Sequence, residues 1–288
     1  VDDIGALANF AQQKSCFTVV GPEAPLANGL VDKFIEKGLA VFGPSKQAAQ
    51  LESSKIWAKE FMQRNNIPTA EFQIFDNPEK AKAFIDSYDK QLVIKADGLA
   101  AGKGVIVCSN KEEAFSAIDK ILVDKAFGSA GSKIIIEERI DGVEASYIAL
   151  CDGNVGIPMA TSQDHKRIFN DDKGPNTGGM GAYSPTPAVD TELAKKIQEE
   201  VIDKTISSLK KDGINFKGFL YAGVMIHDNI PYVLEYNVRM GDPECQPILM
   251  RFNSDLLEYL IAASEGRLEQ LPEISWNKQY AVCVVIAS

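Results

Sequence analysis

Two kinds of hydrophobic pattern alternate along the whole chain. Short apolar runs rich in β-branched residues predict buried strands, and segments whose apolar residues recur every three or four positions predict amphipathic helices. The first unit has a strand at 17–20, a helix through Leu26, Leu30 and Phe34, and a strand at 39–42, with a Gly-Pro turn after each strand. Such alternation is typical of an α/β protein.

The same patterns predict one long helix and two further units. The helix begins at Ser45, includes Lys55 and ends at the Ile67-Pro68 pair, because proline cannot continue a helix. The smaller unit has strands at 72–75, 92–95 and 105–108 and helices at 78–88 and 111–125. The larger unit has strands at 133–138, 145–150, 155–160, 219–227 and 232–237 and helices around 193–201 and 256–261.

Residues 164–183 follow neither pattern, because they are polar and rich in glycine. They predict a loop of about twenty residues, and a loop of that length inside a compact domain is usually functional or mobile.

Composition and charge exclude several classes of protein. The 288 residues include 30 Lys and Arg against 40 Asp and Glu, a formal net charge of -10, which argues against nucleic acid as the main partner. No apolar run approaches the roughly 20 residues that span a bilayer, and the first residues lack a signal-peptide pattern. Five scattered cysteines without a Cys-x-x-Cys pair indicate ordinary thiols. We therefore expect a cytoplasmic protein without a membrane partner.

The strongest local signal is the glycine-rich segment 93–105, which lies between two predicted strands. Its glycines, among them Gly102 and Gly104, allow backbone N–H groups to approach an anion, and Lys95 and Lys103 supply positive charge. The spacing fits neither a P-loop nor the Gly-x-Gly-x-x-Gly pattern. A phosphate cradle and a flexible hairpin with solvated lysines both remain possible interpretations.

A second constellation lies on the last strand of the larger unit. Side chains alternate along a strand, so Glu235, Asn237 and Arg239 share one face. A carboxylate and an amide oxygen can hold Mg²⁺, and the arginine can bind a carboxylate or phosphate with two hydrogen bonds. The alternative is the solvated face of an ordinary amphipathic strand.

Two weaker signals involve loops and strand ends. The run from Gln163 to Arg167 and the glycine-rich run 174–183 suit a loop folded around a small polar ligand, or else a solvated loop. Glu137 ends one predicted strand and Glu144 begins the next, where carboxylates can contact an adenine edge or ribose hydroxyls. Surface glutamates are more commonly just solvated.

Taken in order, these motifs resemble the ATP-grasp superfamily. The order is a helix lysine (Lys55), a strand lysine before a glycine loop (Lys95), a Glu-Glu-x-Ile strand end at 137–140 and a late Glu-x-Asn at 235–237. Within that superfamily, the segments 20–26, 95–104, 163–167, 174–183 and 237–244 closely resemble the phosphoribosylamine–glycine ligase family. The resemblance covers essentially the whole chain.

The resemblance implies an ATP-grasp fold with a partial Rossmann-like N-terminal domain and the start of a C-terminal domain. The implied boundaries are an incomplete N-terminal domain at 1–53, an ATP-grasp domain at 54–270 with a small lid subdomain at about 72–132, and a truncated C-terminal domain at 271–288. The chain is then expected to be a piece of a longer protein.

It also implies the reaction and its participants. ATP would phosphorylate glycine, 5-phosphoribosylamine would attack the glycyl phosphate, and the products would be glycinamide ribonucleotide, ADP and phosphate. The protein would be a monomer or weak oligomer that uses ATP with Mg²⁺ or Mn²⁺ in purine biosynthesis. The implied roles are Lys55, Lys95, Gly102, Gly104, Glu137, Ile140 and Glu144 for ATP; Glu235 and Asn237 for the metal; Glu23, Lys166, Asn176, Thr177, Gly178 and Gly179 for substrate; and Arg239 and Asp164 for catalysis.

One departure and three alternatives accompany this resemblance. Many ATP-grasp enzymes place a second acidic metal ligand about a dozen residues before the Glu-x-Asn pair, where this chain has Ala222-Gly223. The alternatives are another purine-pathway ATP-grasp ligase, a non-catalytic ATP-binding module and a nicotinamide dehydrogenase, which the missing dinucleotide fingerprint already disfavours.

Overall fold

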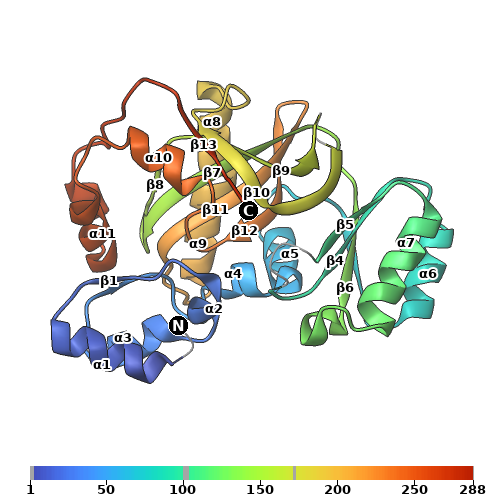
Figure 1. The fold of residues 1–288 in the computed structure, drawn as a ribbon, viewed down its shortest axis with the longest axis horizontal. Helices are drawn as coiled ribbons and strands as arrows, with labels where there is room; N and C mark the ends of the chain where they lie inside the picture. Colours follow the sequence, from blue (N-terminus) through green and yellow to red (C-terminus); the bar gives the residue numbers. More distant parts are fainter. Residues whose placement is uncertain (1–2, 100–103, 171–172, 288) are drawn as a thin grey trace.

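A four-stranded antiparallel sheet lies at the centre of the molecule (Figure 1). In the computed structural model, which describes residues 3–99, 104–170 and 173–287, its strand order is β12-β11-β7-β8. The strands are β7 (Val143–Asp152), β8 (Gly156–Pro158), β11 (Lys217–His227) and β12 (Ile230–Asn237). They overlap the strands predicted from the sequence, because long apolar runs bounded by turns identify buried strands well.

Both faces of the central sheet are covered, which explains why β7 is buried from Ala145 to Asp152. Tyr147 and Ala149 face a core shared with α8 (Thr191–Ile197), a π-helical turn η3 (Gln198–Asp203) and α9 (Lys204–Lys211). Ile148 and Leu150 face a second core shared with α11 (Leu256–Glu265). Because successive side chains point to opposite faces, a strand with apolar residues at every position needs helices on both sides.

A second four-stranded sheet, of order β3-β6-β4-β5, packs two helices against one of its faces. Its strands are β3 (Phe72–Phe75), β4 (Leu92–Ala96), β5 (Val105–Cys108) and β6 (Ile134–Glu138). The prediction that the strand at 133–138 belongs to the larger unit was wrong, because β6 pairs with β3 and β4 in this smaller sheet. Ile94 and Ile136 pack in the core with α6 (Pro78–Asp86) and α7 (Lys111–Ile118), which continues into the π-helical turn η1 (Asp119–Val123) and is followed by the 3₁₀ turn η2 (Gly128–Ser132). Alternation therefore turns Lys95 and Glu137 to the opposite face, toward the central sheet.

The N-terminal part is a small parallel unit. Strands β1 (Thr18–Val19) and β2 (Val41–Phe42) pair in parallel, and α1 (Ile4–Lys14), α2 (Glu23–Ala27) and α3 (Leu30–Glu36) accompany them. The sequence analysis did not identify α1, although Ile4, Leu7, Ala8 and Ala11 have helical spacing and pack in one small core. The turn after β1 places Glu23 at the carboxyl end of that strand.

The prediction of one long helix from Ser45 was wrong. The structure has two helices in this segment, α4 (Gln50–Ser53) and α5 (Lys55–Arg64). Ser54 between them is extended, with φ -136° and ψ 109°. Its Oγ accepts a hydrogen bond from the N–H of Trp57 (3.1 Å), and its hydroxyl donates to Asp97 Oδ1 (3.1 Å). Asp97 Oδ1 also accepts from the N–H of Ile56 (3.1 Å). Two side-chain oxygens thus cap the N-terminus of α5, which satisfies amide groups that a continuous helix would have bonded internally.

We expect Ser54→Ala to lower the free energy of unfolding by about 1–2 kcal/mol, since it removes an N-cap and a contact with Asp97. Urea denaturation followed by circular dichroism measures this. Ser207→Ala on the exposed face of α9 is the matched control and should change the free energy by less than about 0.5 kcal/mol. Equal effects of the two changes would show that the cap does not stabilise α5.

The prediction of a long loop at 164–183 was also wrong. Residues of this segment form a hairpin of β9 (Gln163–Phe169) and β10 (Lys173–Ser184), and β13 (Ala281–Val284) pairs with β10 on its other edge. The ladder contains two register shifts, which accommodate a glycine-rich sequence that shows no apolar alternation. Pairing with a distant strand, rather than local preference, makes this segment a strand.

The remaining elements are α10 (Cys245–Arg251) and the 3₁₀ turn η4 (Leu268–Gln270), which lie before and after α11. Among the residues described above, no helix is both long and apolar enough to cross a lipid bilayer.

Candidate active site

A cavity of about 710 Å³ lies between the smaller sheet, the central sheet and the N-terminal unit. Most of the residues singled out in the sequence line it, from segments far apart in the chain. Those that line it are Glu23, Lys55, Lys95, Gly104, Glu137, Ile140, Glu144, Asp164, Lys166, Asn176, Thr177, Gly178, Glu235, Asn237 and Arg239. Gly179 does not line it, and Gly102 lies outside the described residues.

The smaller sheet contributes a buried cluster of two lysines and one glutamate. Lys95 Nζ lies 3.0 Å from Glu137 Oε2 and donates to the carbonyl of Leu234 on the central sheet (2.9 Å). Lys59, which the sequence analysis missed, lies 3.3 Å from the same carboxylate oxygen. The other oxygen, Oε1, is buried without a hydrogen-bond partner in the described chain. A buried acceptor left unpaired is costly, so this oxygen is expected to meet a donor in the working protein.

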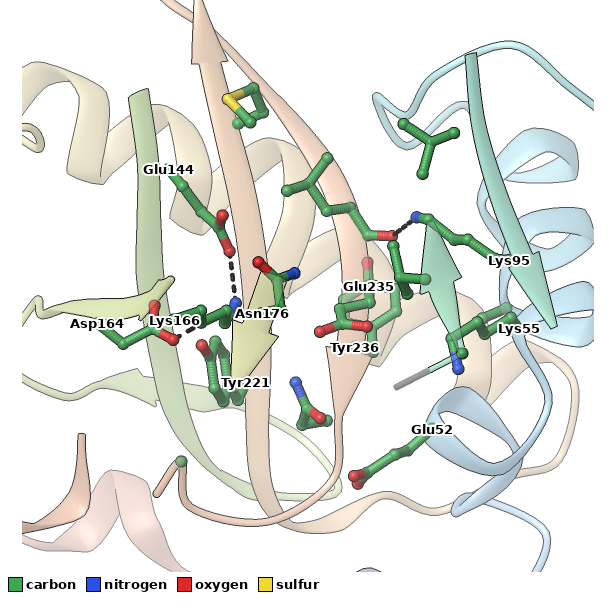
Figure 2. A pocket seen from close by; sticks show the side chains of 18 of the residues that line it. Glu52, Lys55, Lys95, Glu144, Asp164, Lys166, Asn176, Tyr221, Glu235 and Tyr236 are labelled. Carbon is green, nitrogen blue, oxygen red and sulfur yellow. Dashed lines mark hydrogen bonds and ion pairs between the residues drawn. The ribbon is translucent and has the colours of Figure 1, made fainter. Parts of the chain in front are cut away.

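Lys55 occupies the first position of α5, one turn from Lys59. Its ammonium group donates to the carbonyl of Gly98 (3.1 Å), which ties the helix to the glycine-rich segment after β4. Gly98 has φ +97°, a conformation that favours glycine. Figure 2 shows Lys55 and Lys95 on the same side of the cavity, opposite Glu144, Asp164 and Lys166.

The carboxylate and amide predicted to share a face do so on β12. Tyr236 and Val238 pack in the hydrophobic core, and Glu235, Asn237 and Arg239 line the cavity, which Tyr236 also borders. Burial alone would raise the pKa of Glu235, but the charges of Lys166, Lys55, Lys95 and Arg239 outweigh it and lower that pKa. Glu235 is therefore a carboxylate at neutral pH. The residue paired with it on β11 is Gly223, so no acidic side chain comes from that position.

Arg239 is held by three acceptors and keeps one nitrogen free of hydrogen bonds. Its guanidinium donates to Glu52 Oε1 (2.9 Å), Asn237 Oδ1 (3.1 Å) and the carbonyl of Met240 (3.1 Å). Its Nε is buried without a hydrogen-bond partner in the described residues, and Glu23 Oε2 lies 3.8 Å from it. A fixed guanidinium with a spare donor suits an anionic ligand.

The sequence analysis missed Glu52, which positions this arginine. Besides Arg239, Glu52 accepts a hydrogen bond from the N–H of Val238 (2.7 Å) and is only 8% exposed. Burial raises the pKa of Glu52, while Arg239 and the Val238 N–H act to lower it. Nothing in the local sequence signals this role, because the partners are 186 and 187 residues away.

The opposite wall carries a second charged cluster, drawn in Figure 2. Lys166 Nζ lies 2.6 Å from Glu144 Oε1 and 3.4 Å from Asp164 Oδ2. Burial raises the pKa of Asp164 to about 6; Glu244 and Glu144 add to this effect, and Lys166 opposes it. Burial would lower the pKa of Lys166, but its acidic neighbours raise it overall, so this lysine remains charged.

A buried hydrogen-bond network that the sequence analysis also missed supports this wall. The hydroxyl of Tyr221 donates to Glu244 Oε1 (2.5 Å), and the hydroxyl of Ser146 donates to the same oxygen (3.1 Å). Glu244 is 2% exposed and stands in the Asp242–Glu244 segment that carried part of the resemblance. Asp242 and Glu244, the two acidic residues that follow Arg239, were the sequence feature from which this role of Glu244 could have been predicted.

The hairpin supplies the last part of the wall. The hydroxyl of Thr177 donates to the carbonyl of Lys166 (2.8 Å) and accepts from the N–H of Gly179 (3.1 Å). Asn176 is exposed and lines the cavity together with Thr177 and Gly178. In Figure 2 the side chain of Asn176 lies between the Glu144–Lys166 pair and Glu235.

Lysines on both walls and a fixed arginine can together neutralise several phosphate charges within one cavity, and the ionised glutamate beside an amide can bind a divalent cation. Positioning and charge neutralisation are the main demands of phosphoryl transfer. Two sheets that face each other across one cavity agree with the ATP-grasp fold that the sequence resemblance implied, and a solved structure has the same fold. The biotin carboxylase domain of the Hydrogenobacter thermophilus 2-oxoglutarate carboxylase, in complex with MgADP, ADP and bicarbonate, superposes with a TM-score of 0.75 at 18% identity, over 97% of this chain and 60% of that one.

The chain is thus an ATP-grasp protein, which confirms the fold expected from the sequence. Residues 53–245 match the family model described as "Phosphoribosylglycinamide synthetase, ATP-grasp (A) domain", and residues 1–52 match that of its N domain. The chain belongs to the phosphoribosylamine–glycine ligase family, as the resemblance implied, and the enzyme class is an ATP-dependent carbon–nitrogen ligase.

Individual relatives agree with this assignment. Phosphoribosylamine–glycine ligases from Ralstonia nicotianae and Escherichia coli are 53% and 51% identical over 290 residues. Each alignment covers 100% of this chain, and 68% and 67% of the two relatives. The crystal structure of the Thermotoga maritima phosphoribosylamine–glycine ligase superposes with a TM-score of 0.80 at 38% identity, over 86% of this chain and 62% of that one. The chain therefore spans about two thirds of the length of such relatives.

Proposed function

We propose that this chain carries the ATP-dependent ligation of glycine to 5-phosphoribosylamine. In this reaction the glycine carboxylate attacks the γ-phosphorus of ATP, ADP leaves, and a glycyl phosphate forms. The amine of phosphoribosylamine then attacks the glycyl carbon, phosphate leaves and glycinamide ribonucleotide results. The observation that carries the proposal is one cavity lined both by Lys55 and Lys95 and by Glu235 and Asn237.

ATP would lie against the smaller sheet. Lys55 and Lys95 would neutralise its phosphates, since one N–H of Lys95 has no partner in the described residues. The unpaired Glu137 Oε1 would accept from the adenine amino group, and the backbone N–H of Ile140, which donates to no backbone acceptor in the described chain, would bond a ring nitrogen. Glu144 would contact the ribose. Gly104, and Gly102 outside the described residues, would cover the phosphates.

Glu235 and Asn237 fit a magnesium or manganese ion, because they offer two hard oxygen donors on one strand face and the glutamate is ionised. When bound, the metal would neutralise charge on the phosphates. Gly223 opposite Glu235 leaves room for phosphate oxygens and water to complete the coordination shell.

The substrates would occupy the side of the cavity formed by the hairpin and the N-terminal unit. Asn176, Thr177, Gly178 and Gly179 would bind substrate through backbone amides, Lys166 would bind its phosphate or carboxylate, and Glu23 would bind ribose hydroxyls. Arg239 would neutralise the phosphoryl group in transfer with its spare donor. Asp164 would anchor the glycine ammonium or accept the proton of the attacking amine.

The proposed domain boundaries are 1–53, 54–270 and 271–288, with a smaller subdomain at about 72–132. The sheet β3-β6-β4-β5 supports a separate smaller subdomain, and β6 at Ile134–Glu138 belongs to that sheet although it follows residue 132. Residues 281–284 pair with the hairpin strand β10.

We expect the rate to fall at mildly acidic pH. Burial raises the pKa of Asp164 to about 6, with Lys166, Glu144 and Glu244 as its charged neighbours, so Asp164 is ionised above this pH and protonated below it. The kcat/KM for glycine should therefore decrease about tenfold per pH unit below that value. Asp164→Asn should lower the neutral-pH rate and remove this limb of the profile, and Asp228→Asn, at an exposed turn, should leave both unchanged.

The decisive experiment measures Mg²⁺-dependent ADP release with ATP, glycine and freshly generated phosphoribosylamine, and then omits each substrate in turn. Release that requires both glycine and the amine supports the ligase. Release that requires a different carboxylate or amine would favour another ATP-grasp ligase. ATP binding without release under any of these conditions would contradict catalysis by this chain and favour a binding module.

A further inference from the structure

Lys59 stands one helical turn after Lys55 on α5, but it cannot serve a ligand in the same way. It is 2% exposed, and its ammonium has three acceptors: Thr69 Oγ1 (2.7 Å), the carbonyl of Ala70 (3.1 Å) and Glu137 Oε2 (3.3 Å). An ammonium group has three N–H donors, so none remains for a ligand. The ring of Phe72 lies 5.3 Å from the same nitrogen.

Keeping such a charge buried is expensive. Burial lowers the pKa of Lys59 to about 8, with Glu137 opposing this shift and Lys95 adding to it. The ammonium is therefore charged at neutral pH, at a cost that its contacts offset only in part. Buried polar groups of this kind need an explanation beyond stability, because an apolar side chain of similar size would avoid the cost.

The geometry at Glu137 supplies that explanation. Lys59 and Lys95 both approach Oε2, at 3.3 and 3.0 Å, and Oε1 is left buried and unpaired in a residue that lines the cavity. With Lys95 alone, the carboxylate could turn and share both oxygens with one ammonium. With both lysines on one oxygen, the second oxygen is fixed as an unpaired acceptor, and the cluster keeps a net charge of one positive unit.

We infer that Lys59 is a positioning residue that makes the cavity select a 6-amino purine over a 6-oxo purine. Lys59 fixes the carboxylate of Glu137 so that its Oε1 accepts a hydrogen bond from the exocyclic amino group of the nucleotide base. The same oxygen then disfavours a base with a 6-oxo group. This inference rests on the proposed function, because it assumes that the cavity binds ATP. A 6-oxo base presents a carbonyl oxygen, an acceptor, to Glu137 Oε1, so the buried carboxylate oxygen would face another acceptor and lose its partner.

The test compares the dissociation constants of ATP and ITP, with Mg²⁺ present and both substrates absent, by titration calorimetry at neutral pH. The wild type should bind ATP at least about tenfold more tightly than ITP, the value of one charge-assisted hydrogen bond. Lys59→Met should reduce this preference to about threefold or less. Lys82→Met is the matched control, because Lys82 pairs with Asp119 on the helical face of the same small sheet and does not line the cavity.

A double-mutant cycle separates positioning from general damage. Glu137→Gln should reduce the preference to the same extent as Lys59→Met, and combining the two changes should alter the ATP-to-ITP ratio no further, because the lysine acts only through the carboxylate. Lys59→Arg, which keeps a cation beside Oε2, should restore most of the preference. If Lys59→Met does not unfold cooperatively, Lys59→Gln, which keeps donors for Thr69 and Ala70 but no charge, gives the same readout.

The outcomes distinguish failure of the proposed function from failure of the inference about Lys59. A wild type that binds neither nucleotide overturns the proposed function and this inference together. A wild type that binds ATP and ITP equally, or a Lys59→Met protein that keeps the full preference, overturns the inference and leaves the proposed function intact. Loss of the preference in Lys59→Met with its retention in Lys82→Met supports it.

Discussion

Glu235→Gln is expected to reduce Mg²⁺-dependent ADP release by about 1000-fold or more while leaving the fold intact. Glu235 is the carboxylate at the centre of four positive side chains, which lower its pKa and keep it ionised. The substitution keeps the shape of the side chain and removes its charge, so the proposed metal site loses its carboxylate donor. ATP binding in the absence of metal should persist, because the lysines remain.

The measurement is the dependence of ADP release on Mg²⁺ concentration, with a thermal unfolding scan to confirm the fold. Glu60→Gln, at an exposed position of α5, is the matched control and should behave as the wild type. Unchanged activity of the Glu235→Gln protein at limiting Mg²⁺ would remove the Glu235–Asn237 pair from the proposed mechanism.

Arg239→Lys is expected to lower kcat by about 100- to 1000-fold, the effect of removing one well-placed donor to a charge that develops in the transition state. The guanidinium contacts Glu52, Asn237 and the carbonyl of Met240 at the same time, and a lysine ammonium cannot reproduce that planar arrangement. The KM for ATP should change much less than kcat, because Lys55 and Lys95 carry the ground-state phosphate contacts in the proposed mechanism.

Steady-state kinetics with ATP as the varied substrate distinguishes these effects. Arg267→Lys, a surface arginine paired with Glu265, controls for loss of a guanidinium in general. A rise in the KM for ATP with unchanged kcat would assign Arg239 to ground-state binding instead. Glu52→Gln should then reproduce part of the Arg239→Lys defect, since Glu52 is the carboxylate that holds this guanidinium.

Local periodicity was sufficient to predict most strands and helices and the side chains on one face of the site. The alternation along β12 put Glu235, Asn237 and Arg239 on one side before any partner strand was known, because the side-chain period of a strand is a local property. The buried strand β7 was recognised in the same way, from an apolar run without alternation. The order of lysines, glycines and acidic pairs along the chain was enough to indicate the family.

The sequence by itself therefore determined the fold class, the family and the residue types that meet in the cavity. Tertiary structure alone decided the break at Ser54, the pairing of β9 with β10, and the buried partners Glu52, Lys59 and Glu244. The physical reason is the same in each case: Asp97 ends one helix from 43 residues away, β13 stabilises a strand that has no apolar pattern of its own, and Glu52 meets Arg239 across 187 residues. Such contacts depend on which segments the fold brings together, and no local pattern records them.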